Sequence, residues 1–407
     1  MKRIGYYLLL IFLLFSNVLF TWFKLPPFVG YYDEILAILL FIWMMYKINI
    51  RKRILKSTSY ILCCVFIVIV IGISGNILFR YQSSVSAILR DIVIFCKFPI
   101  SFIAMQELHL DDKMYRTLSG KGVKTLKIIT HVILLLGIVS IFFNIGMVQD
   151  EIRHGIHPYM FLFSHPTSLV TCGMFLIAIF SAFEYTGKMT IYIYEVAAII
   201  VLTMRTKGVA LVAVFLFLKF FRNKGKKLKI LYWMGAIGVV ALSLYQKLQM
   251  VFSWSGSGRM SLYTESFGMM ERFFPIGSGF ATYASSLSGK FASSLYNEIY
   301  IPELQLLQGN YLVLGDVGFP YYIGQFGFAG VILSFLILIK IFKITYQDPT
   351  DLGCLAIFAY ILLAMIGENI LSNSGVECAV FLALVSHASK VTVKHIEYKN
   401  SVKIIAN

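Results

Sequence analysis

Four arginines and one aspartate are the residues of this sequence best suited to chemistry: Arg153, Arg205, Arg259, Arg272 and Asp316. A guanidinium group stays charged at any working pH and offers a planar fork of donors that fits phosphate oxygens. Arg205 stands out because it lies where two short apolar runs meet, and a charge near a membrane boundary is costly without a partner. Together the arginines predict an anionic ligand, and the alternative for each one is pairing with a carboxylate or a lipid headgroup.

Five residues could complete such a site. Asp316 precedes an apolar run, and it could either take a proton from an acceptor hydroxyl or cap the helix that follows. Gly277 and Gly279, in PIGSG, allow either close approach of a ligand to the backbone or a plain tight turn. His165 and Tyr322 are candidate substrate contacts, through a hydrogen bond and through ring stacking on a sugar, although membrane interfaces are enriched in aromatic residues in any case.

Three histidines, His154, His157 and His165, lie within one short segment. They lack carboxylate partners at ligand spacing, and no cysteine is near them, so we expect no metal there. The sequence also lacks a Walker loop, a Rossmann glycine fingerprint and the CxxC and HExxH spacings. We therefore expect neither a metal nor a cofactor.

The composition is that of an integral membrane protein. Hydrophobic residues make up 58% of the 407 residues, charged residues 14%, and the mean hydropathy is +0.79. The formal net charge of +16 does not indicate nucleic acid, because the basic residues form short blocks between apolar runs, as in cytoplasmic loops. The six cysteines lie in or beside apolar runs and read as small buried hydrophobes, without a disulfide framework.

The apolar runs have the length of membrane-spanning helices rather than of barrel strands. The fold class is therefore all-α, a polytopic membrane protein of about twelve helices with one long, partly helical extracytoplasmic loop. The predicted spans are 4–23, 33–50, 58–79, 86–107, 127–147, 163–184, 190–204, 206–221, 230–247, 319–341, 352–370 and 376–390.

The chain divides into three parts. Residues 1–250 hold nine helices, residues 251–318 form the long loop, and residues 319–407 hold three helices and a tail. Placing both termini and residues 113–127 in the cytoplasm puts most basic residues inside, as the positive-inside rule requires. The long loop is then extracytoplasmic, and a structured loop between spans is where we expect a site.

The order of motifs resembles the bacterial O-antigen polymerase and ligase superfamily. The resemblance rests on TMRTKG, then a long loop with SGR, then PIGSGF, and then GDVGFPYYIGQFGFAG. The last motif looks most like the Wzy-type polymerases of O-antigen and capsule assembly. Ligases typically carry a His-Asn pair where this chain has Gly315 and Asp316, which favours the polymerase branch, although the arginine–glycine motif typical of the polymerases is not matched either.

The resemblance implies a metal-independent glycosyltransferase at the outer face of the cytoplasmic (inner) membrane. Such an enzyme moves a glycan from undecaprenyl pyrophosphate onto a lipid-linked repeat unit. Its partners would be that lipid-linked oligosaccharide, the bilayer and a chain-length regulator, with no nucleic acid. The roles implied are catalytic for Asp316, Arg205 and Arg259, and substrate-binding for Arg272, Arg153, His165, Gly277, Gly279 and Tyr322.

Two other functions stay open from the sequence. One is the ligase of the same superfamily, which passes the glycan to a lipid core. The other is a flippase or transporter of lipid-linked oligosaccharides, for which we would expect charges near the membrane midplane and repeat symmetry between halves. This chain instead concentrates charge toward one membrane face, which favours an enzyme.

Overall fold

The computed structural model describes residues 2–23, 26–153, 155–184, 189–221, 258–299, 301, 314–346 and 352–405. These residues are mostly helical and form no strand, only two isolated bridges, Val148 with Tyr159 and Arg153 with Ile156. The prediction of an all-α chain is therefore confirmed. The predicted span 230–247 and parts of the long loop, 251–257 and 302–313, lie outside the described residues.

Each predicted apolar range within the described residues overlaps a helix, although several ends differ from the predicted bounds. These helices are α1 (Lys2–Phe23), α2 (Tyr32–Arg51), α3 (Lys56–Phe79), α4 (Val85–Glu107), α6 (Val123–Phe142), α7 (Pro166–Ala182), α8 (Thr190–Leu202), α9 (Thr206–Phe221), α14 (Gly318–Thr345), α15 (Leu352–Ala364) and α17 (Gly375–Ile405). Shorter elements are η1 (Pro27–Tyr31), α5 (Leu110–Thr117), the π-helical η2 (Leu118–Gly122), α11 (Gly258–Arg272), α12 (Ser286–Lys290), η4 (Ser294–Asn297) and α16 (Ile370–Asn373).

Four of the described helical segments are long and apolar enough to cross a membrane: Ile4–Phe23, Lys56–Phe79, Val123–Phe142 and Gly318–Thr345. Three shorter helices, α7, α8 and α15, are also strongly apolar. Helices of this kind satisfy their own backbone hydrogen bonds, which lipid cannot do for them. The apolar helices are therefore those expected of a membrane protein.

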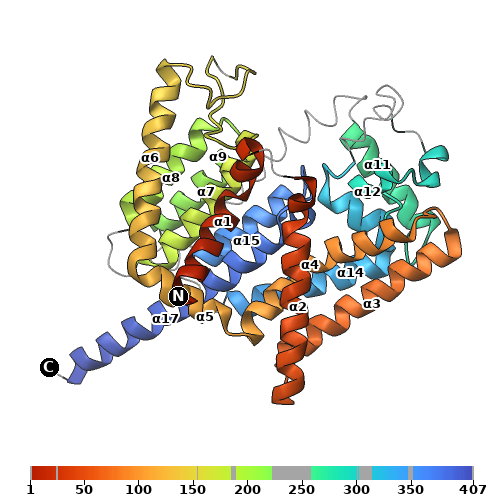
Figure 1. Ribbon diagram of the computed structural model, residues 1–407, viewed down its shortest axis with the longest axis horizontal. Helices are drawn as coiled ribbons and strands as arrows, with labels where there is room; N and C mark the ends of the chain where they lie inside the picture. The colour runs from red at the N-terminus through yellow and green to blue at the C-terminus, as the bar shows by residue number, and fades with distance from the viewer. Residues whose placement is uncertain are drawn as a thin grey trace.

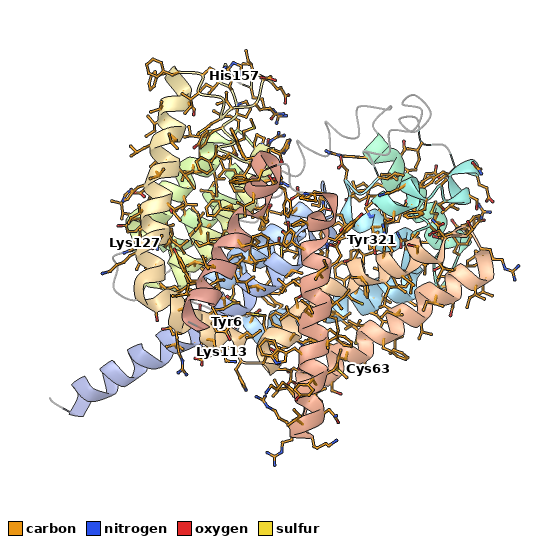
Figure 2. The ribbon with its side chains drawn as sticks, viewed as in Figure 1. Tyr6, Cys63, Lys113, Lys127, His157 and Tyr321 are labelled. Atoms are coloured by element: carbon orange, nitrogen blue, oxygen red, sulfur yellow. The ribbon has the colours of Figure 1, made fainter. Side chains whose placement is uncertain are left out.

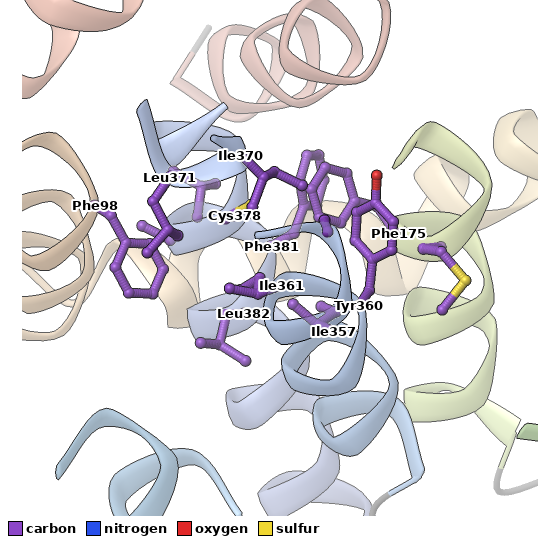
Figure 3. Packing of buried hydrophobic residues seen from close by; sticks show 14 of the residues in the cluster. Phe98, Phe175, Ile357, Tyr360, Ile361, Ile370, Leu371, Cys378, Phe381 and Leu382 are labelled. Atoms are coloured by element: carbon purple, nitrogen blue, oxygen red, sulfur yellow. The ribbon is translucent and has the colours of Figure 1, made fainter. Parts of the chain in front are cut away.

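Figure 1 shows how the helices are arranged. The helices α6, α7, α8 and α9 stand together with α1 on one side, and α3, α14, α11 and α12 lie on the other. Between the two groups lie α2, α4, α15 and the first part of α17, whose C-terminal part extends away from the bundle. The first part of α17 is almost wholly buried, and the Phe381 ring stacks on Phe175 of α7 with ring centroids 4.7 Å apart (Figure 3).

The segment 273–284 of the predicted loop is inserted into a break in α14. The break is at Gly327, which has a φ of 57°. In an unbroken helix the carbonyl of Gln325 would accept from the amide of Ala329. Here the Gln325 carbonyl accepts from the Gly279 amide at 2.9 Å, and the Ala329 amide donates to Pro275 at 3.0 Å. The loop thus replaces one turn of the helix's own hydrogen bonds.

Side chains from three helices hold the inserted segment. The Asn76 side chain of α3 accepts from the Phe280 amide at 2.8 Å and donates to the Phe280 carbonyl at 2.9 Å. Asp91 of α4 accepts from the Ala281 amide at 2.6 Å, and Gln325 donates to the Tyr283 carbonyl at 2.7 Å. Non-helical backbone inside a helix bundle requires such partners. This part of the predicted loop is therefore a buried structural element.

The glycines expected to meet a ligand lie against other parts of the protein. A Cβ at Gly277 would lie 2.4 Å from the amide nitrogen of Gly327, and one at Gly279 would lie 2.5 Å from the amide nitrogen of Asn76. Both glycines also have a positive φ, 75° and 103°. The close backbone approach inferred from PIGSG is present, with α14 and α3 as its partners. A contact of Gly277 and Gly279 with a substrate stays a prediction.

Candidate functional site

Several basic side chains gather where α8 meets α9, close to the start of α7. We call the side chains of Arg153, His165, Arg205, Lys207 and Arg259 the cationic cluster. Arg205 lies in the turn between α8 and α9, and its Nη2 donates to Gln149 Oε1 and to His165 Nε2, both at 2.8 Å. His165 is the N-cap residue of α7, directly before Pro166, whose fixed φ suits the first helical position.

Carboxylates pair with three of the cations in the cluster. Arg153 Nη2 lies 2.8 Å from Glu151, Lys207 Nζ lies 2.6 Å from Glu368, and Arg259 Nη2 lies 2.8 Å from Asp316. Arg205 differs from these three, because its hydrogen-bond partners among the described residues are neutral. Its Nε is also buried with no acceptor in that part of the chain. A buried donor without an acceptor is costly, so Arg205 is the cation with capacity left for an anion.

The members of the cluster lie close enough to influence one another's protonation. Burial, and then the charges of Arg205, Lys207 and Arg153, lower the pKa of His165 to about 4. Burial, and then the charge of Arg153, lower the pKa of Arg205, and Arg259 acts in the same direction. Like charges raise one another's energy when they are held together. The cluster therefore surrounds a neutral imidazole with basic groups, whose charge the three paired carboxylates partly offset.

Two groups, the Arg205 guanidinium and the Thr167 amide, each need a lone pair on the His165 ring, and only one of them can find it. Arginine can only donate, so its contact with Nε2 requires a lone pair there. The amide of Thr167 points at Nδ1 from 3.2 Å and requires a lone pair on that nitrogen as well. A neutral imidazole has only one such nitrogen. An anionic oxygen between Arg205 and His165 would resolve this conflict by accepting from both side chains.

Helix ends add to the positive potential. Arg205 precedes the first residue of α9, and Lys207 lies in its first turn. The N-terminal end of a helix carries a partial positive charge, so basic residues there are electrostatically unfavourable and an anion is favourable. Asp316 lies two residues before α14, and His165 caps α7. The arrangement suits a phosphate-bearing ligand.

Asp316 pairs with Arg259 and does not cap α14. The N-cap of α14 is Val317, without a side-chain cap, so the capping alternative is not adopted. The two side chains are about half exposed, 45% for Arg259 and 46% for Asp316. The carboxylate is thus accessible at the edge of the cluster, within reach of a ligand that binds there.

Arg272 lies outside the cationic cluster. Its Nη2 lies 2.5 Å from Glu298 and 3.1 Å from the Tyr81 hydroxyl, and its guanidinium lies 5.1 Å from the centroid of the Phe273 ring. The hydrogen bond from Arg272 lowers the pKa of Glu298. Arg272 and Arg259 are at opposite ends of α11, and a rise of about 1.5 Å per residue separates their backbones by about 20 Å. The structure does not bring Arg272 together with Arg205.

An apolar cavity of about 340 Å³ adjoins this region. Its walls come from α4, α11, α14 and the turn after α15, and they include Phe95, Tyr263, Phe319, Tyr322 and Met365. Tyr263 is one helical turn from Arg259, and Phe319 is three residues after Asp316. The structure therefore places Tyr322 in a hydrocarbon-lined cavity next to the cluster rather than in the cluster itself.

Two residues of the site gave no signal in the sequence. Gln149 belongs to a polar segment with no motif, and Glu368 lies in a short turn more than 150 residues from Lys207. Lys207 itself could be noticed beside Arg205. Figure 2 shows His157 among the polar side chains at the end of the bundle near α6, and its Nδ1 lies 3.0 Å from the Gln149 carbonyl.

No group of three or more His, Cys, Asp or Glu side chains that could hold a metal ion is found among the described residues, and His154 lies outside them. The site is thus characterised by arginine, histidine and carboxylate chemistry. Comparison of the chain with protein-family models, with curated proteins and with solved structures gives no match.

Proposed function

We propose that this protein is a polysaccharide polymerase of the cytoplasmic membrane. It would transfer a glycan from undecaprenyl pyrophosphate onto a lipid-linked repeat unit, as in O-antigen or capsule assembly. The observation that carries the proposal is Arg205, whose described partners are neutral and whose Nε has no acceptor among the described residues. The family resemblance of TMRTKG and GDVGFPYYIGQFGFAG supports the same class.

The pyrophosphate and the polyprenyl chain of the glycan donor fit two neighbouring features, the cationic cluster and the apolar cavity. A pyrophosphate would accept from Arg205 and lie in the field of Arg153, Lys207 and Arg259. The first isoprene units of the polyprenyl chain would occupy the apolar cavity that begins one helical turn from Arg259, and the rest of the chain would lie in the bilayer. Outside the cytoplasm a nucleotide sugar is absent, so a membrane-bound pyrophosphate is a suitable activated donor.

The reaction needs one bond formed and one broken. The acceptor hydroxyl oxygen bonds to the anomeric carbon, the bond from that carbon to the pyrophosphate oxygen breaks, and the electron pair leaves with the pyrophosphate. Arg205 and Arg259 would stabilise that developing charge. A pyrophosphate that engages Arg259 would draw it from Asp316, and the freed carboxylate would take the hydroxyl proton.

The topology proposed has twelve spans, with both termini and residues 113–127 in the cytoplasm and the cationic cluster outside. Two features support it. The basic blocks of the sequence fall between apolar runs on one side. In Figure 2 His157, near the cluster, and Lys113 lie at opposite ends of the helix bundle. A chain-length regulator is the further partner that the family resemblance implies.

A transporter of lipid-linked oligosaccharides is the second candidate, because the bundle also contains buried charges. Lys97 of α4 is 2% exposed and pairs with Asp33 and with Glu34, the latter at 3.1 Å. Ionisable groups inside a helix bundle are typical of transport pathways. The ligase of the same superfamily is the alternative within the enzyme class.

The deciding experiment analyses the lipid-linked and surface glycans of a strain that lacks this chain. Single repeat units on the lipid indicate a polymerase, whereas absence of surface glycan indicates a ligase or a transporter. The strain is then complemented with Arg205→Ala, Arg205→Lys or, as a matched control, Arg116→Ala. Arg116 is 67% exposed and pairs with Asp112 on α5, away from the cluster.

We expect Arg205→Ala to accumulate normally and to slow elongation about 10- to 150-fold, which corresponds to the loss of about 1.5–3 kcal/mol from one hydrogen bond to a charged group. Arg205→Lys should not restore the rate, because an ammonium cannot reproduce the guanidinium fork. Arg116→Ala should elongate as the wild type does. Normal elongation by Arg205→Ala would leave the proposal without its site.

A further inference from the structure

A second cavity, of about 200 Å³, lies between α1, α7 and the beginning of α17, and its character is polar. Hydroxyl, amide and carboxylate groups from four parts of the chain line it, including those of Ser16, Asn17, Tyr32, Thr171, Asn373 and Glu377. One ordered water needs only about 10–15 Å³ of such space. The cavity therefore has room for a ligand group of several ring atoms.

Glu377 is the one carboxyl group among the lining residues described. Its side chain belongs to a residue that is 4% exposed, and it accepts a hydrogen bond from the Tyr32 hydroxyl. The Tyr32 hydroxyl also lies 2.8 Å from Ser16 Oγ. Within the described part of the chain, the second carboxylate oxygen of Glu377, Oε2, has no hydrogen-bond partner. A buried carboxylate oxygen of this kind is costly unless a donor is supplied.

The chemistry of the lining selects the ligand class. No basic side chain is among the described residues that line the cavity, so a pyrophosphate would find no cationic partner here. The amide and hydroxyl groups would lose hydrogen bonds to a hydrocarbon chain, which excludes a prenyl tail. A ring that bears several hydroxyl groups fits both conditions, because its hydroxyls can donate to Glu377 and accept from a neighbouring hydroxyl.

Hydrogen bonds connect this cavity to the cationic cluster by two routes. Ser164, next to His165, donates to Asn17 Oδ1 from its amide at 3.1 Å and from its hydroxyl at 3.0 Å. On the other route, Thr171 Oγ1 lies 2.5 Å from the Tyr360 hydroxyl.

The second route continues from Tyr360 to the cluster itself. The Tyr360 hydroxyl lies 3.4 Å from Glu368, which pairs with Lys207. Figure 3 shows Tyr360 in the packed core between α15, α17 and α7. The polar cavity is thus part of one connected polar region with the proposed pyrophosphate site.

The segment 365–377, which runs from the end of α15 through α16 into α17, lies along all three features. Met365 and Leu371 line the apolar cavity, Glu368 pairs with Lys207 of the cationic cluster, and Asn373 and Glu377 line the polar cavity. One segment of the chain thus joins the polar cavity to the two features that the donor would occupy. A second substrate bound in the polar cavity would lie beside the donor.

We propose that the polar cavity binds a sugar ring of the acceptor glycan, with Glu377 accepting a hydrogen bond from a ring hydroxyl. The identification of this ring as the acceptor rests on the function proposed above. The binding of a neutral, hydroxylated ring in the cavity does not rest on that function, and it can be measured without any glycan donor present.

The test uses the purified full chain in detergent micelles and saturation-transfer-difference NMR with methyl glycosides of glucose, galactose and N-acetylglucosamine as probes. We expect saturation transfer to at least one glycoside, and about tenfold weaker binding to Glu377→Gln, because a hydrogen bond to a charged acceptor is about twice as strong as one to a neutral acceptor. Ser168→Phe, at another lining position, should abolish binding by filling the space. Asn49→Ala, an exposed position on α2 bonded to Lys52, is the control and should bind as the wild type does.

Three results would overturn the inference: no transfer to any glycoside, equal binding by the wild type and Ser168→Phe, or transfer to ethylammonium but to none of the glycosides. If Glu377→Gln does not fold, Ser168→Phe alone decides. Glycoside binding by a protein that transfers no glycan would keep this inference and refute the proposed polymerase. Undiminished elongation by Ser168→Phe would refute the acceptor assignment alone.

Discussion

Replacing Gly277 with alanine tests the junction between the segment 273–284 and α14. The new Cβ would lie 2.4 Å from the Gly327 amide nitrogen and 2.5 Å from the Gln325 carbonyl oxygen. Both are backbone atoms of a packed helix, so neither can swing away as the end of a side chain would. Gly277 also has a φ of 75°, a region that costs a residue with a Cβ about 1–2 kcal/mol.

The overpacking adds about 1–3 kcal/mol, so we expect Gly277→Ala to lower the free energy of unfolding by about 2–5 kcal/mol. Gly268→Ala is the matched control. Gly268 lies on the exposed side of α11 and has nothing within 4 Å of the position its Cβ would take. Alanine is the better helix former there, and the free energy of unfolding should rise by up to about 1 kcal/mol.

The assay is SDS-induced unfolding of the purified protein in mixed micelles, followed by far-ultraviolet circular dichroism. It gives the free energy of unfolding for the wild type and both variants under the same conditions. A Gly277→Ala protein as stable as the wild type would refute the reasoning about the junction. If that stable variant also lost glycan elongation, the glycine would serve a ligand after all.

Three further predictions concern the site and its orientation. Burial and neighbouring cations lower the pKa of His165 from 6.5 to about 4, so between these pH values the unfolded chain binds a proton that the folded chain does not. The stability of the wild type should therefore fall as the pH drops from 6.5 towards 4. Thermal melts of His165→Gln should lose this part of the pH dependence, and an unchanged dependence would contradict the prediction. Asp316→Asn breaks a half-exposed ion pair with Arg259, so it should lower the free energy of unfolding by less than about 1 kcal/mol. It should nevertheless stop elongation at single repeat units, because an amide cannot take the hydroxyl proton. Glycans of normal length would show that Asp316 serves only as an ion-pair partner of Arg259. A cysteine at the exposed position Ser286 should react with an impermeant maleimide on intact spheroplasts, and labelling only after membrane disruption would reverse the topology.

The helices could be predicted from the sequence because the length of an apolar run is a local property. The run before Phe79 and the one after Gly318 each give a helix whose ends fall within a few residues of the prediction. The break at Gly327 could not be predicted. It depends on hydrogen bonds from Gly279 and Pro275, about 50 residues away in the chain, and the sequence shows only that glycines are present.

Part of the candidate site could be predicted, because a charged residue between two apolar runs is also a local feature of the sequence. Arg205 was conspicuous as a charge between two apolar runs, and the structure places Arg153 and His165 near it. Arg272 was grouped with Arg259 because both adjoin glycine-rich stretches of the predicted loop, Arg259 after SGSG and Arg272 before PIGSG. In the structure Arg259 and Arg272 lie at opposite ends of α11, so the length of this helix keeps them apart. Glu368 could not be identified from the sequence, because it pairs with Lys207 only in the folded chain.

The shared segment 365–377 has a consequence for how this protein can diversify. A substitution that adapts one cavity to a new ligand shifts a backbone that also shapes the other cavity and positions Glu368. The ligand preferences of the two cavities are then inherited together, and neither can drift without selection acting on the other. Exchanging residues 365–377 between two such proteins as a single block should therefore transfer specificity more cleanly than exchanging any one residue within it.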